Sequence, residues 1–443
     1  MHADSSVESD KKSKWALPFF TVWTGQAFSI FGSQLVHFAL IWWLTITTGS
    51  GTVLATATIV GILPQIILGP LAGAIVARGN RRVIMMLADA LVATATAVLA
   101  FLFFMDTVQT WQVYLVLFVR AVAGSFHWPA MAASTSLMVP QEHLSRIQGA
   151  NQTLNGGLSI ITAPLAALLL ERIPLQYILG IDIGTALLAI LPLFFIQIPQ
   201  PPESRIEQGA GIVKPSLWAD MLTGFRYVGK WPGLLLILIM ATLINFVLSP
   251  AFSLMPLLVK EEFGGGAMQL AWVESAGGIG IILGGLLLSI WGGFKRRILT
   301  SLLGLVGIGI GTLLIGFSPS TSLYLVVIAM FFVGFMMPIT NGPIFAVLQA
   351  VVAPDMQGRV FTLVGSLSAA MSPLGLAIAG PLSDIVGVRA WFVAAGIVSG
   401  CMGLVSFLIP AIVHVEDRAA VPVLEEVGVP ANPLLVEQDI EAG

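Results

Sequence analysis

The residues best able to do chemistry in this chain are isolated charges inside long apolar segments. Arg120 lies about nine residues into one such segment, and Glu274, Asp182 and Asp89 each lie about two turns into others. If these segments cross a membrane, each charge costs at least about 2.5 kcal/mol on insertion scales and needs a reason. Arg120 could be a binding or proton-coupling group, or a structural partner for carbonyls or an acid of a neighbouring helix.

The three carboxylates differ in their sequence surroundings. Glu274 lies in AWVESAGGIGIILGG, where the following glycines permit close helix approach. There it could exchange a proton or attract a cation from a wet cavity, or simply be solvated at the cavity's outer mouth. Asp182 and Asp89 are alternatives for this role, and packing against neighbouring backbone groups is the simpler interpretation of both. We therefore predict that Arg120 and Glu274 govern coupling.

Polar side chains also recur along one face of the first apolar segment. They fall within about 80° of arc at 3.6 residues per turn. This face comprises Gln26, Ser29, Ser33 and His37. It should meet water or another helix, and His37 could carry protons or be a hydrogen-bonded packing residue. A weaker counterpart in the second half of the chain comprises Asn245, Ser249 and Ser253.

The elements that must position these groups are membrane helices. The chain has 443 residues, of which 57% are hydrophobic and 10% charged, against roughly 25% charged in a typical soluble domain. No Asp, Glu, Lys or Arg occurs from Ala16 to Ala77, a length sufficient for two spans of about 20 residues. We predict an all-α, polytopic protein in the lipid bilayer of the cell membrane.

No catalytic or cofactor motif emerges. The five histidines lack metal-ligand spacing, the single cysteine, Cys401, excludes an internal disulfide, and no Walker loop or G-x-S-x-G is present. The net charge of -3 does not indicate a nucleic-acid partner. We expect no enzyme activity, no metal and no cofactor. Any pumping would draw on an ion gradient or on the substrate's own gradient.

The sequence contains an internal repeat, with similar motifs in its two halves. GPLAGAIVARGNRR at 69–82 is echoed by GGLLLSIWGGFKRR at 284–297, and a mid-helix proline, Pro164 or Pro373, follows in each half at similar offset. Such repetition is typical of transporters with two parallel six-helix halves. Counting apolar stretches predicts twelve transmembrane helices. The expected segments are an N-terminal tail at 1–16, halves at 17–198 and 234–413, a linker at 199–233 and a C-terminal tail at 414–443.

The positive charges predict the orientation. Sixteen Lys and Arg fall on the side of both termini, whereas Arg172, Lys260 and Arg389 fall on the other. Because cytoplasmic loops hold the excess of Lys and Arg, both termini should be cytoplasmic.

About 400 positions carry a likeness to a known family. The chain resembles the major facilitator superfamily, and within it the drug:proton antiporters of the macrolide-efflux type. RAVAG, with Arg120 and Gly124, is similar to the helix 4 motif associated with proton coupling, and SFHWPAMAASTSLMVPQEHLSR and APDMQGRVF are more specific to the subgroup. The loop between helices 2 and 3 is represented by Gly73, Arg78, Asn80, Arg81 and Arg82.

Two departures from the family pattern stand out. Ala77 replaces the acidic residue expected before Arg78, the usual carboxylate latch between the halves. Around Pro164 the family motif has glycines, whereas this chain retains small residues of other types: Ser159, Ala163 and Ala167.

The resemblance implies a secondary exporter of amphipathic small molecules, such as macrolide-like drugs or lipophilic metabolites, exchanged for protons by alternating access. We expect a monomer. A lipid or siderophore exporter of the same fold is an alternative, and a membrane receptor or scaffold without transport is an alternative of another class. A scaffold needs no buried charge, so Arg120 counts against it.

Overall fold

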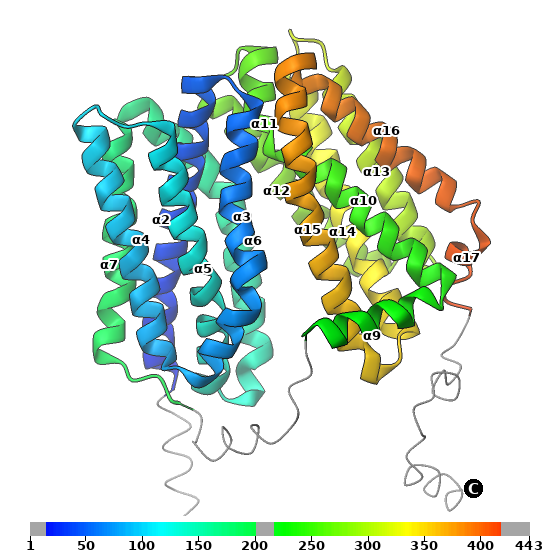
Figure 1. The fold of residues 1–443 in the computed structure, drawn as a ribbon, viewed down its shortest axis with the longest axis horizontal. Coiled ribbons are helices and arrows are strands. Elements are labelled where there is room, and N and C mark those ends of the chain that lie inside the picture. Colours follow the sequence, from blue (N-terminus) through cyan, green and yellow to red (C-terminus); the bar gives the residue numbers. More distant parts are fainter. Residues whose placement is uncertain (1–14, 201–216, 418–443) are drawn as a thin grey trace, which may run out of the picture.

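A computed structural model of the chain describes residues 15–200 and 217–417 (Figure 1). Nearly all of the expected N-terminal and C-terminal tails lie outside these ranges, as does the 201–216 part of the expected linker. So do six of the cations used to predict orientation: Lys11, Lys12, Lys14, Arg205, Lys214 and Arg418.

Twelve helices of the described chain are long and apolar enough to cross a membrane, which confirms the predicted number. The first group contains α2 (Ala16–Thr48), α3 (Gly51–Arg78), α4 (Arg81–Phe104), α5 (Thr110–Met138), α6 (Gln141–Arg172) and α7 (Leu175–Phe195). The second contains α10 (Pro232–Ser253), α12 (Ala267–Trp291), α13 (Arg297–Phe317), α14 (Leu323–Val351), α15 (Pro354–Val386) and α16 (Val388–Ser406). Shorter elements are α9 (Leu217–Gly229), α11 (Met255–Leu257), the π-helix η2 (Leu258–Glu262) and α17 (Pro410–Val413).

The repeated motifs occupy matching elements. α5 and α14 are both 29 residues long, and each carries a proline in its later part, Pro129 or Pro343. The helices that follow, α6 and α15, have 32 and 33 residues and contain Pro164 and Pro373. The chain thus forms two pseudo-symmetric six-helix groups.

Tight turns join consecutive helices because their end residues satisfy the exposed backbone groups. Gly49 ends α2 with φ 58°, a left-handed conformation that glycine adopts without strain. The Ser50 side chain then accepts a hydrogen bond from the Val53 amide and begins α3. Asn80 caps α4 in the same way through the Val83 amide.

The two groups meet where α3 begins and α15 ends, and their ribbons diverge toward the end where α9 lies (Figure 1). Asp384 of α15 accepts hydrogen bonds from the Gly51 amide at 2.5 Å, the Thr52 amide at 3.1 Å, and the Ser50 and Thr52 hydroxyls at 2.9 and 2.6 Å. A carboxylate of one half therefore caps the first turn of a helix in the other.

Backbone approach makes this contact close. A Cβ on Gly380 of α15 would lie 3.0 Å from the Thr52 Cα and 2.7 Å from the Ala55 Cβ. Nearer the middle of the molecule, the Ser275 hydroxyl of α12 donates to the Ile160 carbonyl of α6 at 3.0 Å. We call the end with Gly51 and Asp384 the capped end, and the opposite end the α9 end.

Candidate functional site

A cavity of about 710 Å³ lies among the helices of the first half and α12 of the second. α2, α3, α4, α5 and α6 supply most of its wall, and Leu270 and Glu274 of α12 complete it. The polar side chains on the wall are Ser29, Ser33, Gln34, His37, Thr58, Gln65, Asp89, Arg120, His127, Ser159, Thr162 and Glu274. The predicted polar face of the first span therefore faces a cavity for most of its length.

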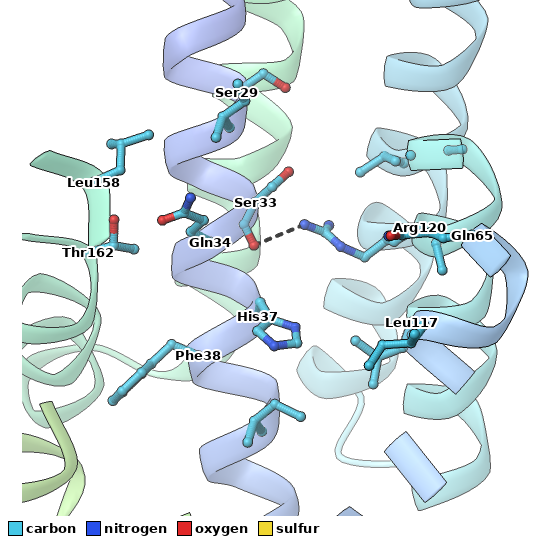
Figure 2. A pocket seen from close by; sticks show the side chains of 18 of the residues that line it. Ser29, Ser33, Gln34, His37, Phe38, Gln65, Leu117, Arg120, Leu158 and Thr162 are labelled. Carbon is cyan, nitrogen blue, oxygen red and sulfur yellow. Dashed lines mark hydrogen bonds between the residues drawn. The ribbon is translucent and has the colours of Figure 1, made fainter. Parts of the chain in front are cut away.

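Arg120 forms a buried ion pair on this wall. Its Nη1 lies 2.5 Å from Oδ2 of Asp182, whose side chain is 1% exposed. Nη1 also donates to the Thr96 hydroxyl at 2.8 Å, and Nη2 donates to the Ser33 carbonyl at 3.2 Å (Figure 2). The Ser33 and Thr96 hydroxyls each donate to Asp182 at 3.1 Å. One network thus ties together α2, α4, α5 and α7.

The partner of Arg120 differs from the one that we expected. The sequence analysis linked Arg120 with Glu274 in coupling, and it gave packing against backbone groups as the simpler interpretation of Asp182. In the structure three side chains donate to the Asp182 carboxylate, while Glu274 lies half-buried on the cavity wall contributed by the second half. Sequence cannot reveal this choice because each of the three helices involved faces several neighbours.

Asp89 belongs to a second polar cluster. Its Oδ2 accepts a hydrogen bond from the Gln26 amide nitrogen at 3.0 Å, and its Oδ1 lies 3.4 Å from Nε2 of His127. Both Asp89 and Gln26 are buried, with 6% and 0% of their surfaces exposed. Asp89 and His127 line the same cavity as Arg120.

His37 lies on α2 one turn beyond Ser33, and its ring faces the cavity beside Leu117 and Arg120 (Figure 2). Leu158 and Thr162 of α6 lie on the opposite side of α2 in the same view. The cavity therefore surrounds the polar face of α2, and His37 is exposed within it.

The arginines of the loop between α3 and α4 bind within their own half. Arg81 donates to the Gln200 side chain at 3.1 Å and to the Ala77 carbonyl at 3.2 Å. Arg82 donates to the carbonyls of Leu193 and Phe194 at the end of α7. Cations at a helix C-terminus stabilise its unpaired carbonyls. This contact anchors α7 to the loop without a partner from the other half.

The remaining predicted residues lie outside the polar clusters. Asn245 donates to the Ala241 carbonyl of its own helix at 2.9 Å and is not on the cavity wall. Gly124 lines the cavity, and neither Gly124 nor Gly73 would place a Cβ within 4 Å of another group. Pro164 and Pro373 lie half-buried inside α6 and α15. Arg78 and Asn80 are exposed at the loop.

Thr96 and His127 are site residues that the sequence analysis did not single out. Thr96 lies seven residues after Asp89 on α4, and His127 lies seven residues after Arg120 on α5. Two turns of an α-helix span about seven residues, so each lies on the same face as its predecessor. That spacing was a usable signal. Over the described ranges, no three His, Cys, Asp or Glu side chains gather as metal ligands.

Efflux proteins from several bacteria are similar in sequence to this chain over most of its length. Macrolide efflux protein A of Streptococcus pyogenes is 33% identical over 396 residues, covering 89% of this chain and 96% of that protein. Macrolide efflux protein A of Enterococcus faecalis is 32% identical over 328 residues, covering 74% of this chain and 100% of that protein. The multidrug efflux pump Tap of Mycolicibacterium fortuitum is 30% identical, covering 86% and 92%.

Solved structures share the fold at low identity. The nucleoside transporter NupG aligns with a TM-score of 0.59 at 14% identity, covering 86% of this chain and 97% of that chain. A D-xylose-proton symporter aligns with a TM-score of 0.61 at 12% identity, covering 87% and 96%. The family model of the Major Facilitator Superfamily matches residues 22–376 and 234–434. With twelve helices that can span a membrane, in two six-helix groups, the chain belongs to the Major Facilitator Superfamily and is a multi-pass membrane transporter rather than an enzyme.

Proposed function

We propose that this protein is a secondary exporter of amphipathic small molecules, including macrolide-like drugs, and that it exchanges them for protons by alternating access. The observation that carries the proposal is the Arg120–Asp182 ion pair on the wall of a cavity to which both halves contribute. The names of the relatives, macrolide efflux protein A and multidrug efflux pump Tap, support the substrate class.

The architecture supports alternating access. The halves are joined at the capped end through Asp384 and diverge toward the α9 end (Figure 1). The Lys and Arg distribution assigns the α9 end, with the loop that contains Arg81 and Arg82, to the cytoplasm. Divergence of the halves at that end would let substrate enter from the cytoplasm, as an exporter requires. Rocking of the two halves would separate Asp384 from α3 and close the α9 end.

The ion pair supports proton coupling. A proton that reaches Asp182 removes its charge and leaves Arg120 without a charged partner in a site of low dielectric. Because the network joins four helices, the change would be transmitted to the whole first half. His37 lies beside Arg120 on the cavity wall and is a route for that proton.

Glu274 supports recognition of the cargo. It brings a carboxylate from the second half to a cavity that is walled mainly by the first half, and much of the rest of that wall is apolar. An amphipathic molecule with a positive charge would contact both surfaces at once. A lipid or siderophore exporter remains the alternative, and a siderophore's negative charge would be repelled by Glu274.

A susceptibility and accumulation panel tests the proposal. Cells with and without the gene are compared for macrolides, cationic dyes, lipids and siderophores, before and after a protonophore collapses the gradient. We expect gene-dependent protection against amphipathic drugs that the protonophore abolishes. Arg120→Ala should eliminate that protection, whereas the control Arg172→Ala, at the capped end of α6, should retain it. Protection that survives the protonophore would exclude proton exchange, and an effect on siderophores alone would favour the alternative.

A further inference from the structure

Two polar tiers with the same helical spacing lie at the cavity. The residues of the tiers that line it are Ser33, Asp89, Arg120 and His127, and the other members are bonded to these side chains. The Arg120 tier comprises Ser33 of α2, Thr96 of α4, Arg120 of α5 and Asp182 of α7. The Asp89 tier comprises Gln26 of α2, Asp89 of α4 and His127 of α5. On each of the three shared helices the tiers are seven residues apart, which is two turns or about 10 Å. α4 runs opposite to α5 and parallel to α2, so all three shifts point toward the α9 end.

The tiers differ in where their carboxylate originates. On α7, the position seven residues beyond Asp182 is Ala189, which is fully buried and apolar. The Asp89 tier instead has its acid on α4, next to a histidine in place of an arginine. The Arg120 tier therefore pairs its acid with an arginine, whereas the Asp89 tier pairs its acid with a histidine, a side chain whose charge depends on whether it holds a proton.

The Asp89 tier contains hydrogen-bond acceptors that have no partner among the described residues. Gln26 uses its amide nitrogen on Asp89 Oδ2, and its carbonyl oxygen Oε1 is buried without a hydrogen-bond partner among the described residues. His127 Nε2 lies 3.4 Å from Asp89 Oδ1 but makes no hydrogen bond of acceptable geometry. When His127 is neutral, its unprotonated nitrogen also becomes an acceptor. A negative charge with two further acceptors is complementary to an N–H-bearing cation.

The charged groups around this tier are few. α5 contributes Arg120, two turns away and paired with Asp182 of α7. α2 contributes His37, eleven residues beyond Gln26, and α12 contributes Glu274. The cavity-lining residues of α3 and α6 include no charged side chain. Within the first half, Asp89 is therefore the described carboxylate on the cavity wall, and Glu274 is its counterpart from the second half.

We propose that Asp89, Gln26 and His127 form a binding subsite for the protonated amine of a cationic amphipathic substrate, open when His127 is neutral and closed when His127 is protonated. This inference rests on the proposed export function and names the substrate class and the pH control of one part of its cavity. In the closed state, the positively charged imidazolium of His127 neutralises the carboxylate of Asp89. In the open state, an entering cation meets Asp89 before it reaches the Arg120 tier, because Asp89 lies nearer the α9 end.

Direct binding to the purified full-length protein in lipid nanodiscs tests this subsite. The probes are rhodamine 6G, which carries N–H groups and a charge that does not change near neutral pH, and Nile red, which is neutral. The titrations are run at about pH 5.5 and about pH 8, on either side of the unperturbed histidine pKa of about 6.5. For the wild type we expect rhodamine 6G to bind about tenfold more tightly at the higher pH, and Nile red to bind equally at both.

Two variants separate the roles of the acid and the histidine. Asp89→Asn keeps the size of the side chain and an acceptor for Gln26, and it should weaken rhodamine 6G about tenfold at high pH while leaving Nile red unchanged. His127→Gln cannot acquire a charge, so it should keep tight rhodamine 6G binding at both pH values. Glu142→Gln, at the exposed start of α6, is the matched control and should behave as the wild type. Thermal unfolding of each variant verifies that it is folded.

The outcomes distinguish the subsite from the wider function. If Asp89→Asn binds rhodamine 6G like the wild type, or if His127→Gln keeps the full pH dependence, the subsite is overturned while the exporter proposal stands. The same holds if Glu274→Gln, and not His127→Gln, removes the pH dependence. If the wild type binds neither probe, both proposals fail for this class of substrate.

Discussion

The two halves share one helical plan but use different residues inside it. In the first half, the charged or titratable side chains that line the cavity are buried Asp89, half-buried Arg120 and His127, and exposed His37. Buried Asp182 pairs with Arg120. In the second half, among the residues described, Glu274 is the charged residue on that wall. The charged clusters of the second half lie at its ends, as in Arg389–Glu262 at 2.6 Å and Arg296–Asp417 at 3.1 Å.

Inside the second half, glycines at helix–helix contacts are the distinguishing feature. A Cβ on Gly284 or Gly280 of α12 would collide with the backbone of α14, at Phe335 and Phe331. A Cβ on Gly309 of α13 would collide with Gly400 of α16. Close approach of this kind maximises van der Waals contact between helices in a bilayer. The comparison indicates that the first half holds most of the ionisable side chains of the cavity and that the helices of the second half pack closely through glycine.

The largest expected effect comes from splitting the ion pair. Arg120→Ala leaves Asp182, 1% exposed, as a buried charge without its cation, and we expect a loss of about 3–5 kcal/mol of stability. The double variant Arg120→Ala/Asp182→Ala removes both charges and should recover most of that stability without recovering gradient-driven export. Thermal unfolding and dye efflux measure the two effects. If Arg120→Ala is as stable as the wild type, the buried ion pair of the first half does not contribute to stability as we expect.

Leucine at two adjacent glycines tests the packing of the second half. Gly284→Leu forces a side chain into the Phe335 backbone, and overpacking of this kind costs about 1–3 kcal/mol or more. Gly285→Leu on the same helix has nothing within 4 Å of its Cβ and should be tolerated. Size-exclusion profiles and melting temperatures of the purified variants report the difference. Equal stability of the two variants would argue against glycine-mediated contact between α12 and α14.

Asp384→Asn tests the contact that holds the halves together. The substitution removes the negative charge of the group that accepts four hydrogen bonds at the start of α3. A hydrogen bond to a charged acceptor stabilises a protein by about 1.5–3 kcal/mol at most. We expect the capped end to open more often. In a Cys401→Ser background, alkylation of Ser383→Cys, which is buried at this contact, should become several-fold faster. Labelling of the exposed control Ser320→Cys should not change. An unchanged rate at position 383 would show that Asp384 does not hold this end closed.

The smallest effect is expected at the surface of the second half. A hydrogen bond with His414, and then the charge of Arg296, lower the pKa of Asp417. A lowered folded-state pKa stabilises the protein above the unfolded pKa of about 3.9, and this contribution is lost as the pH falls through the folded value. Asp417→Asn should therefore lower the melting temperature slightly at pH 7 and progressively less below about pH 4. If Asp417→Asn lowers the melting temperature more than Asp384→Asn does, the surface charges of the second half contribute more to stability than the comparison of the halves implies.

Much of the architecture could be predicted because it depends on local composition. A bilayer requires about 20 apolar residues per helix, so the twelve spans are visible as uninterrupted apolar stretches. The duplication is visible because the segment at 69–82 and the mid-helix Pro164 have counterparts at similar offset in the second half, at 284–297 and Pro373. The polar face of α2 followed from helical periodicity alone, and most of it faces the cavity.

The sequence by itself determined which residues carry charge at membrane depth: Arg120, Asp182, Asp89 and Glu274. Only the tertiary structure decided their partners. Each helix of a bundle faces several neighbours, and the one that Arg120 contacts depends on how α5 rotates and slides against α2, α4 and α7. For that reason Asp182 pairs with Arg120, Asp89 pairs with His127, and Glu274 approaches them across the cavity from the other half.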